Sequence, residues 1–323
     1  MQRDLPLWAR GLVAALLIGA SVWMLNIEVL RNAAGSSVAL VALGIVSASS
    51  LRGMHVPLGL WPEGPWRARF SVGVVVSVAV VFSIVMVSAD PAAPDVLGLI
   101  DRGAFALIVV GVVAWGLAWA FVRQDSAAGW YGVATAAGVL PFLVGIVELA
   151  AGPDGVCLFG ADPAGGCGVS SVRTFLFLLP VYAAVSLVTL DLTFRRFLIG
   201  WPDRADAVLV LASALAFGLW VWVVGSDVPL VATPWWVGAL AATSAGAVYV
   251  LSGSLLVASY LTGLLYAATA ALRVARPGGS LEAAAGIGPV YGVALGVTAA
   301  VLLGLLVRRR GIALPWPRKR EGG

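Results

Sequence analysis

The sequence predicts an all-α protein, a polytopic transmembrane helical bundle of about ten spans with both termini in the cytoplasm. Of the 323 residues, 61% are hydrophobic and only 11% are charged, whereas about a quarter of the residues in a soluble domain are charged. Apolar windows of about 20 residues, long enough to cross a bilayer as a helix, follow one another along the chain. These runs are continuous and do not alternate with a period of two, which disfavours a membrane β-barrel.

The expected spans follow from the hydropathy of successive windows, and together they form one integral membrane domain covering 1–323. The spans are 8–27, 33–50, 70–89, 103–122, 130–151, 172–192, 206–224, 232–250, 253–272 and 287–307. The apolar run from Leu230 to Leu272 is too long for one helix. We expect it to break at Ser252 and Gly253.

The basic residues set the orientation, because cytoplasmic loops are enriched in Lys and Arg. With the N-terminus inside, 15 of the 20 basic residues lie on the cytoplasmic side and 5 lie outside. The basic tail 308–323 is then also cytoplasmic, which gives an N-in, C-in topology. The apolar part of 8–27 is too long for a typical signal peptide, so we expect it to stay as a membrane helix. The expected location is a cell membrane, the plasma membrane of a prokaryote.

The composition excludes several kinds of site. His55 is the single histidine, so a metal site that needs two histidine ligands cannot form. The net charge of +4 comes from loop and tail residues, and we expect no nucleic-acid partner. The chain has no phosphate-binding loop, dinucleotide-binding glycine motif or haem motif. We therefore expect no cofactor and no metal.

The only two cysteines, Cys157 and Cys167, lie in one glycine-rich loop after the fifth expected span. In the N-in topology this loop is outside the cell, where disulfides persist. We expect the two cysteines to form a disulfide that ties down the loop. Two unrelated thiols are the alternative.

Glycines recur on one face of the last expected span. Gly288, Gly292, Gly296 and Gly304, with Ala300 between the last two, follow one another every four residues. Such a stripe of small residues lets a neighbouring helix approach closely. We interpret it as helix packing within this chain, with a homodimer interface as the alternative.

Two acidic residues near the ends of apolar spans require an explanation, because an ionised group in lipid is costly. Glu148 lies near the outer end of the fifth expected span and Asp191 near the inner end of the sixth. Arg195 follows Asp191 by four residues, so the two share one face of a helix. Both acids are candidates for a functional role or a structural role in the core.

The surroundings of Asp191 resemble a known family. The chain reads L-D-L-T-F-R-R-F-L at Leu190–Leu198, and the next span holds A-F-G-L-W-V-W with Phe217. Further on it has Y-L-T-G-L-L-Y at Tyr260–Tyr266 and G-G-S-L at Gly278–Leu281. Over residues 180–300 this order resembles the CPBP intramembrane proteases, which include CAAX-processing and bacteriocin-processing enzymes. Their motifs are E-E-x-x-x-R, then F-x-x-x-H, then H-x-x-x-N.

The chain departs from this family pattern at the catalytic positions. Leu190 replaces the first acid, Asp191 shortens the second, and Val221 stands where the histidine is expected. Gly288 and Gly292 lie where the last histidine and the asparagine would be. In the family the acids and histidines are thought to activate water, as general-base hydrolysis requires. The resemblance therefore implies a CPBP-like scaffold that lacks most of the catalytic set.

Three functions follow as hypotheses. The leading one is a non-catalytic CPBP-like membrane protein, in which Asp191 and Arg195 form a structural or partner-binding pair. If the family's catalytic site lies in a cavity between these helices, the glycines that replace its polar residues would close that cavity by direct helix contact. We then expect no sizeable polar cavity beside Asp191. The alternatives are an active intramembrane peptidase that uses Asp191, and a transporter or permease subunit. Besides the lipid bilayer, the expected partners are another membrane protein or a second copy of the chain.

Overall fold

The structure is a computed structural model that describes 7–25, 46, 49, 127–152, 156–158, 170–200, 202, 205–224, 233–276 and 288–310. Every element within these ranges is a helix, and no strand occurs among them. The helices are α1 (Leu7–Leu25), α5 (Ala127–Ala150), α6 (Ser171–Val185), η2 (Ser186–Ile199), α7 (Ala207–Val224), α8 (Trp235–Ser252), α9 (Leu255–Val274) and α10 (Pro289–Arg310). The predicted all-α class is confirmed for the described residues.

Five of these helices are long and apolar enough to cross a membrane. They are α5 from Gly129 onward, α7, α8, α9 and α10. The described part of the chain therefore has helices of the kind expected in a multi-pass, membrane-embedded bundle. The expected spans 70–89 and 103–122, and nearly all of 33–50, lie outside the described residues. The total of ten spans stays a prediction.

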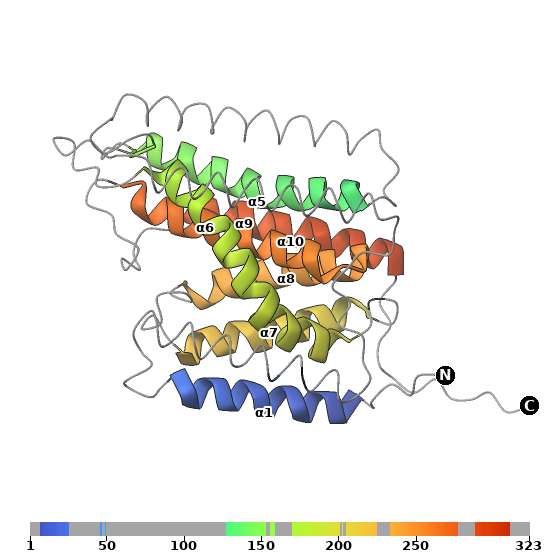
Figure 1. Cartoon of the computed structure of the whole chain (residues 1–323). Helices are drawn as coiled ribbons and strands as arrows, with labels where there is room; N and C mark the ends of the chain where they lie inside the picture. The colour runs from blue at the N-terminus through green and yellow to red at the C-terminus, as the bar shows by residue number, and fades with distance from the viewer. Residues whose placement is uncertain are drawn as a thin grey trace, which may run out of the picture.

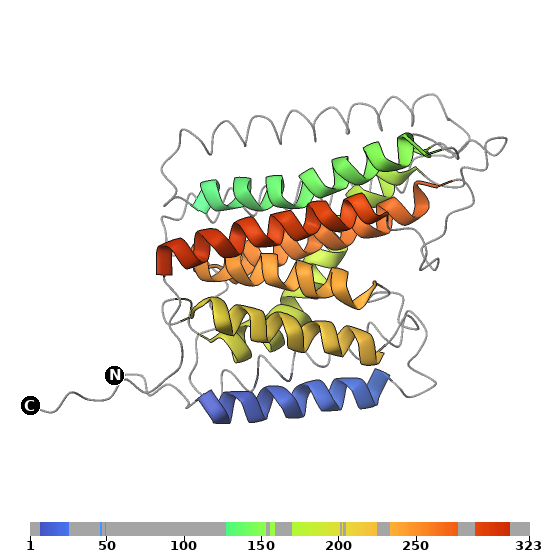
Figure 2. The same cartoon turned by 180° about the vertical axis from the view of Figure 1, so that it is seen from behind.

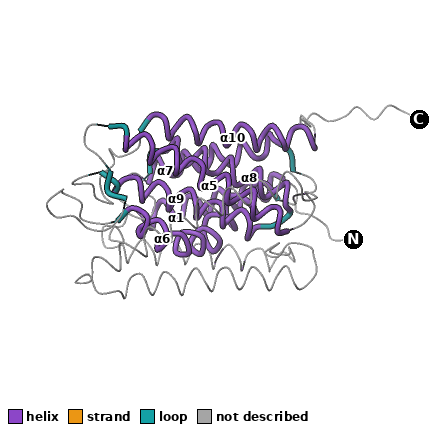
Figure 3. Tube along the Cα trace, turned by 90° about the horizontal axis from the view of Figure 1, so that it is seen from above, coloured by secondary structure: helices purple, strands orange, loops and turns teal. Residues whose placement is uncertain are grey.

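Most of the described helices lie side by side along a common direction (Figures 1 and 3). The continuous helix α6–η2 runs obliquely across them, and α1 lies at one edge beside α7 and η2 (Figures 1 and 2). Helix α9 is at the centre, packed against α5, α6, α8 and η2. In an apolar window of 18 residues within α9, 89% of the window is buried, compared with 28% of the corresponding window in α10. The polar residues on α9 therefore face protein on nearly all sides.

The break between α8 and α9 falls where the sequence predicts it. Helix α8 ends at Ser252, and Gly253 follows with a φ of 69°, a left-handed conformation that favours glycine. The side chain of Ser254 then accepts a hydrogen bond from the backbone N–H of Val257 and caps α9. Because the turn is so short, α8 and α9 are antiparallel neighbours.

The sixth expected span, 172–192, is too short. In the structure the helix continues through η2 to Ile199, although Pro180 lies within α6. It ends at Gly200, which has a φ of 78° and donates its N–H to the Arg195 carbonyl five residues earlier. Phe197 and Ile199 are buried in the core, and this burial accounts for the extension. Asp191 thus lies inside a helix and not near its end.

A close approach of two helices, in which the backbone of one meets the other, joins α6 to α9. A Cβ at Gly263 would lie only 2.7 Å from the Cβ of Ala183 and 2.8 Å from its backbone nitrogen. Gly263 belongs to a stripe of small residues, Ser259, Gly263, Ala267 and Ala271, which recur every four positions. This seam holds the oblique helix α6–η2 against α9, next to the polar residues Ser259 and Thr262 of α9.

Candidate functional site

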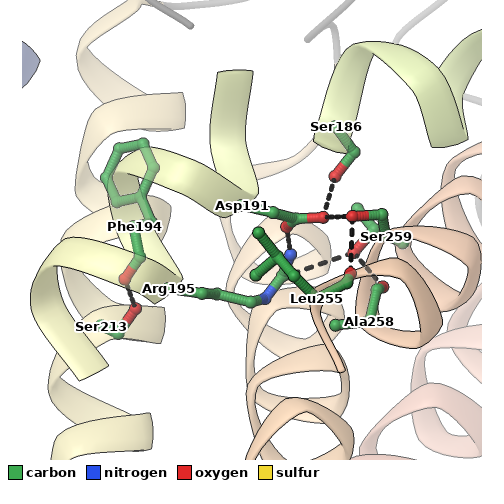
Figure 4. A network of polar contacts seen from close by, with 9 residues as sticks. Ser186, Asp191, Phe194, Arg195, Ser213, Leu255, Ala258 and Ser259 are labelled. Atoms are coloured by element: carbon green, nitrogen blue, oxygen red, sulfur yellow. Dashed lines mark hydrogen bonds and ion pairs between the residues drawn. The ribbon is translucent and has the colours of Figure 1, made fainter. Parts of the chain in front are cut away.

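The candidate site is a buried cluster of polar residues between η2 and the start of α9 (Figure 4). Its centre is Asp191, which is fully buried, and Arg195 on the same face of η2 is 5% exposed. The guanidinium of Arg195 forms an ion pair with Oδ1 of Asp191 through Nη1. The structure thus brings together the two residues that the sequence singled out.

Hydroxyl groups satisfy the other oxygen of the Asp191 carboxylate. Ser186 Oγ, from the start of η2, donates to Asp191 Oδ2 at 3.1 Å. Ser259 Oγ of α9 also donates to Oδ2, and the same hydroxyl lies 2.8 Å from the Leu255 carbonyl. Each hydroxyl of a serine carries one proton to donate. The carboxylate therefore has a charged partner on one oxygen and hydroxyl donors on the other.

Arg195 also links η2 to α9. Its Nη2 donates to Thr262 Oγ1 at 2.9 Å, and the threonine hydroxyl donates to the Ala258 carbonyl at 3.0 Å. Its Nε has no hydrogen-bond partner among the described residues. A buried ion pair is favourable only where further hydrogen bonds compensate the loss of water. Here the hydroxyls of Ser186, Ser259 and Thr262 provide much of that compensation.

The neighbouring residue Arg196 has a different role, at the end of the helix. Its Nη1 donates to the Gly200 carbonyl at 3.0 Å and lies 3.1 Å from the hydroxyl of Tyr249 on α8. The Tyr249 hydroxyl itself donates to the same Gly200 carbonyl at 2.8 Å. A cation at the carboxyl end of a helix also interacts favourably with the helix dipole. Arg196 and Tyr249 therefore fix the end of η2 against α8.

A small cavity adjoins Arg195. It is lined by Phe194, Arg195, Ser213, Phe217, Ala242, Thr262 and Tyr266. The volume of the cavity is about 10 Å³, enough for roughly one water molecule. Asp191 does not line it. Nothing as large as a peptide fits in this cavity.

Phe217, the family-motif position, lies on the wall of this cavity. It packs edge-on against Phe194 with ring centroids 5.1 Å apart, and it also contacts Trp220 at 5.7 Å. Val221, where the family has histidine, is buried and lies near the backbone of Gly238. On the α7 side the cavity is lined by Phe217 and by Ser213, whose hydroxyl donates to the Phe194 carbonyl. Val221 supplies no group that can transfer a proton at the position of the family's histidine.

Glu148 is not part of this cluster. Its Oε1 accepts the backbone N–H of Val290 at 3.0 Å, and Oε2 accepts that of Tyr291 at 2.9 Å. It therefore caps the first turn of α10, where a negative charge is favoured by the helix dipole. The hydroxyl of Tyr291 is 2.9 Å from that of Thr269, ten residues along α9 from Ser259. Ten residues of a helix span about 15 Å, so Glu148 cannot cooperate with Asp191.

The four glycines at the start of α10 and within it have different neighbours. A Cβ at Gly288 would fall on the carboxylate of Glu148, and one at Gly292 would lie 3.0 Å from the ring of Trp236. A Cβ at Gly296 or Gly304 would meet nothing within 4 Å. Neither Gly288 nor Gly292 lies beside Asp191, so they do not close a cavity there. Their tight contacts are with α5 and α8.

Cys157 lies in a short segment that joins two helix ends. Its N–H donates to the carbonyl of Ala275 at 2.6 Å, and its carbonyl accepts the N–H of Ser171 at 3.1 Å. The segment thereby joins the end of α9 to the start of α6. Cys157 is buried and disulfide-bonded. Cys167 lies outside the described residues, so its part in the expected pair stays a prediction.

Metal chemistry has no obvious location in the described part of the chain. No group of three or more His, Cys, Asp or Glu residues within it could hold a metal ion. The single histidine, His55, lies outside the described residues. The polar cluster around Asp191 consists of one carboxylate, one guanidinium group and hydroxyl groups.

Sequence reasoning missed the hydroxyl partners of the cluster, although α9 carries a signal for them. Ser259, Thr262, Tyr266 and Thr269 recur at spacings of three, four and three residues, which places them on one face of a helix. A polar face on an otherwise apolar membrane helix points toward protein partners. Asp191 is the acid that this face meets.

The chain was compared with known proteins. No protein-family model, curated protein or solved structure matches it. The resemblance to CPBP proteases therefore rests on the residues of 180–300 alone, and it stays a hypothesis.

Proposed function

We propose that the chain is a non-catalytic, multi-pass membrane protein on a CPBP-like scaffold. In this proposal the Asp191–Arg195 pair holds η2 against α9 and carries out no chemistry. The observation that supports it most strongly is the state of Asp191, which is fully buried and whose two oxygens face Arg195, Ser186 and Ser259. The expected role is structural, or binding of a membrane-protein partner or a second copy of the chain.

Hydrolysis would require a different environment for this carboxylate. A general base must reach the proton of a water molecule that itself reaches the substrate. The adjacent cavity is about 10 Å³ and lies beside Arg195, with Asp191 absent from its lining. One carboxylate without a histidine or a metal is also a weak hydrolytic site. These features favour a structural pair over a peptidase.

The proposal includes an N-in, C-in topology in a prokaryotic plasma membrane. Arg195 and Arg196 lie near the end of η2, at the same end of the bundle as Arg308–Arg310 of α10, since both groups contact the last residues of α8. Arg173 and Arg273 lie near the opposite end, where Cys157 joins α9 to α6. The more basic end is assigned to the cytoplasm by the positive-inside rule.

A comparison of protein N-termini tests the absence of catalysis. Membranes carrying the wild type and Asp191→Asn should give the same set of N-termini. The variant Gly263→Ala serves as the matched control, because it weakens the same helix pair without changing the carboxylate. Termini that appear with the wild type and Gly263→Ala but disappear with Asp191→Asn would show Asp191-dependent proteolysis and refute the proposal.

A further inference from the structure

The small cavity beside Arg195 is lined by residues of four helices, η2, α7, α8 and α9. Its volume is about 10 Å³, which is close to the smallest volume that holds one water molecule. Each of its polar lining residues is 5% exposed or less, and they are Arg195, Ser213, Thr262 and Tyr266. Polar groups as deeply buried as these need hydrogen-bond partners inside the protein.

The Nε–H group of Arg195 is a donor that lacks an acceptor. Nη1 of the same guanidinium group pairs with Asp191, and Nη2 donates to Thr262 Oγ1. Nε has no hydrogen-bond partner among the described residues. A buried donor without an acceptor is costly, because it has lost its bonds to water. The cavity is the space beside Arg195 in which an acceptor fits.

Three hydroxyl groups on the cavity wall add further hydrogen-bonding capacity. The Ser213 hydroxyl donates to the Phe194 carbonyl (Figure 4), and the Thr262 hydroxyl donates to another backbone carbonyl. Each of these two oxygens keeps a lone pair that can still accept. The Tyr266 side chain interacts with Thr233, but its hydroxyl has no hydrogen bond of good geometry among the described residues. The wall therefore offers both donors and acceptors.

We propose that this cavity is a binding site for one buried water molecule, which accepts the Nε–H of Arg195 and donates to the oxygens of Ser213 and Thr262. The second lone pair of the water is then free to accept the hydroxyl of Tyr266. An anion would use the N–H donor but would face the lone pairs of two oxygens. A cation would lie beside a guanidinium group. Water offers donors and acceptors together, and the volume leaves no room for a larger neutral molecule.

The bound water connects helices that direct contacts join only in part. Arg195 belongs to η2, Ser213 to α7 and Thr262 to α9, and a bridging water is nearly as favourable as a direct hydrogen bond. It also compensates part of the cost of burying the guanidinium group. Asp191 does not line the cavity, so this water is not placed for activation by the carboxylate. Its role is to hold α7 against the Asp191–Arg195 pair.

The direct test is a crystal structure of the full-length protein grown in a lipid mesophase, at a resolution that shows ordered water. We expect an electron-density peak in the cavity about 3 Å from Arg195 Nε. A cavity without a peak, in a map that shows other buried waters, would overturn the proposal. An anomalous signal at the same place after soaking in bromide would identify an anion site and would overturn it as well.

A pair of variants of equal shape provides the second test. Ala242→Val and Ala242→Thr each enlarge a side chain that lines the cavity, and each should displace the water. Only threonine supplies an oxygen that can accept the Nε–H of Arg195. Ala242→Val should therefore unfold at a temperature about 2–4 °C below that of Ala242→Thr in the same detergent.

Two outcomes of this comparison would contradict the water site. Equal unfolding temperatures would mean that crowding alone decides the stability at this position. A higher temperature for Ala242→Val would mean that the cavity prefers an apolar occupant, because filling a space without water with methyl groups is stabilising. If neither variant folds, the electron density of the wild type decides.

This inference does not depend on the absence of catalysis. The density in the cavity and the Asp191-dependent N-termini are separate readouts, and the Ala242 variants leave the carboxylate unchanged. The water site and the non-catalytic function can therefore fail independently.

Discussion

The two acids that the sequence singled out, Asp191 and Glu148, are stabilised in different ways. Asp191 is fully buried and is neutralised by side chains, Arg195 from its own helix and the hydroxyls of Ser186 and Ser259. Glu148 is half-buried and is bound by two backbone N–H groups of α10. Side-chain pairing needs a second charge in the bundle, whereas a helix start supplies its own partial positive charge. The loss of a partner should therefore cost more at Asp191.

Each acid is also accompanied by a glycine that the packing requires. Gly263 brings α6 and α9 into contact beside the Asp191 cluster, and Gly288 leaves room for the Glu148 carboxylate. The two glycines differ in which atoms lie beside them. At Gly263 the neighbour is the backbone and Cβ of Ala183, and at Gly288 it is a side chain. A backbone cannot move aside as a side chain can, so the first site should be the less tolerant.

The largest effect is expected from breaking the buried ion pair. Arg195→Met leaves the Asp191 carboxylate buried without its counter-charge, and the free energy of unfolding should fall by about 3–5 kcal/mol. The double variant Asp191→Leu/Arg195→Met should recover most of this loss, because no charge then stays buried. Equilibrium unfolding in detergent micelles measures both. Equal destabilisation by the single and double variants would show that the pair is not coupled as the structure indicates.

The second effect concerns the seam between α6 and α9. Gly263→Ala places a Cβ against the backbone of Ala183 and should destabilise the protein by about 1–3 kcal/mol, as overpacking does. Gly296→Ala is the control, since its Cβ would meet nothing within 4 Å, and it should change the stability little. The midpoint of thermal unfolding in the same detergent distinguishes them. A larger loss in Gly296→Ala would contradict the assignment of the tight seam to α9.

The third effect tests the cap that Glu148 provides. Glu148→Gln keeps the shape but removes the charge and turns one acceptor into a donor that faces the N–H of α10. The expected cost is about 1–2 kcal/mol, which is smaller than that of Arg195→Met. Equilibrium unfolding under the same conditions gives the comparison. A cost as large as that of the broken ion pair would mean that the backbone cap contributes as much to stability as the buried pair, which contradicts the expected difference between Glu148 and Asp191.

Within the described residues the sequence predicted the helices well, because long apolar runs have few alternatives in a membrane protein. The break at Gly253 was also predictable, since an uninterrupted apolar run longer than a bilayer must turn. The helix that contains the sixth expected span, 172–192, ends seven residues later than expected, at Ile199. Arg195 and Arg196 lie beyond residue 192, where the expected span ends, because charge usually marks a span boundary. In the structure each has specific partners, which hydropathy does not report.

The cluster around Asp191 was only partly predictable. The spacing of Asp191 and Arg195 follows from local geometry alone, since residues four apart share a helix face. Ser259 lies 68 residues after its partner Asp191, and Thr262 lies 67 residues after its partner Arg195. Which helix meets which face is decided by tertiary packing. The polar stripe on α9 shows that a partner exists but does not identify Asp191 as that partner.

The smallest effect concerns Arg196 and Tyr249, whose contact at the end of η2 is the counterpart of the Glu148 cap at the start of α10. Tyr249→Phe keeps the ring but removes the hydroxyl that donates to the Gly200 carbonyl, and the expected cost is about 1 kcal/mol. Arg196 still reaches that carbonyl, which limits the loss. The control is Tyr131→Phe, because the buried Tyr131 hydroxyl has no hydrogen-bond partner among the described residues. Removal of an unsatisfied hydroxyl should be neutral or stabilising, so thermal unfolding should shift downward for Tyr249→Phe alone. A downward shift of equal size for Tyr131→Phe would attribute the loss to the removal of any buried hydroxyl, and the assigned role of Tyr249 in closing the helix end would then be wrong.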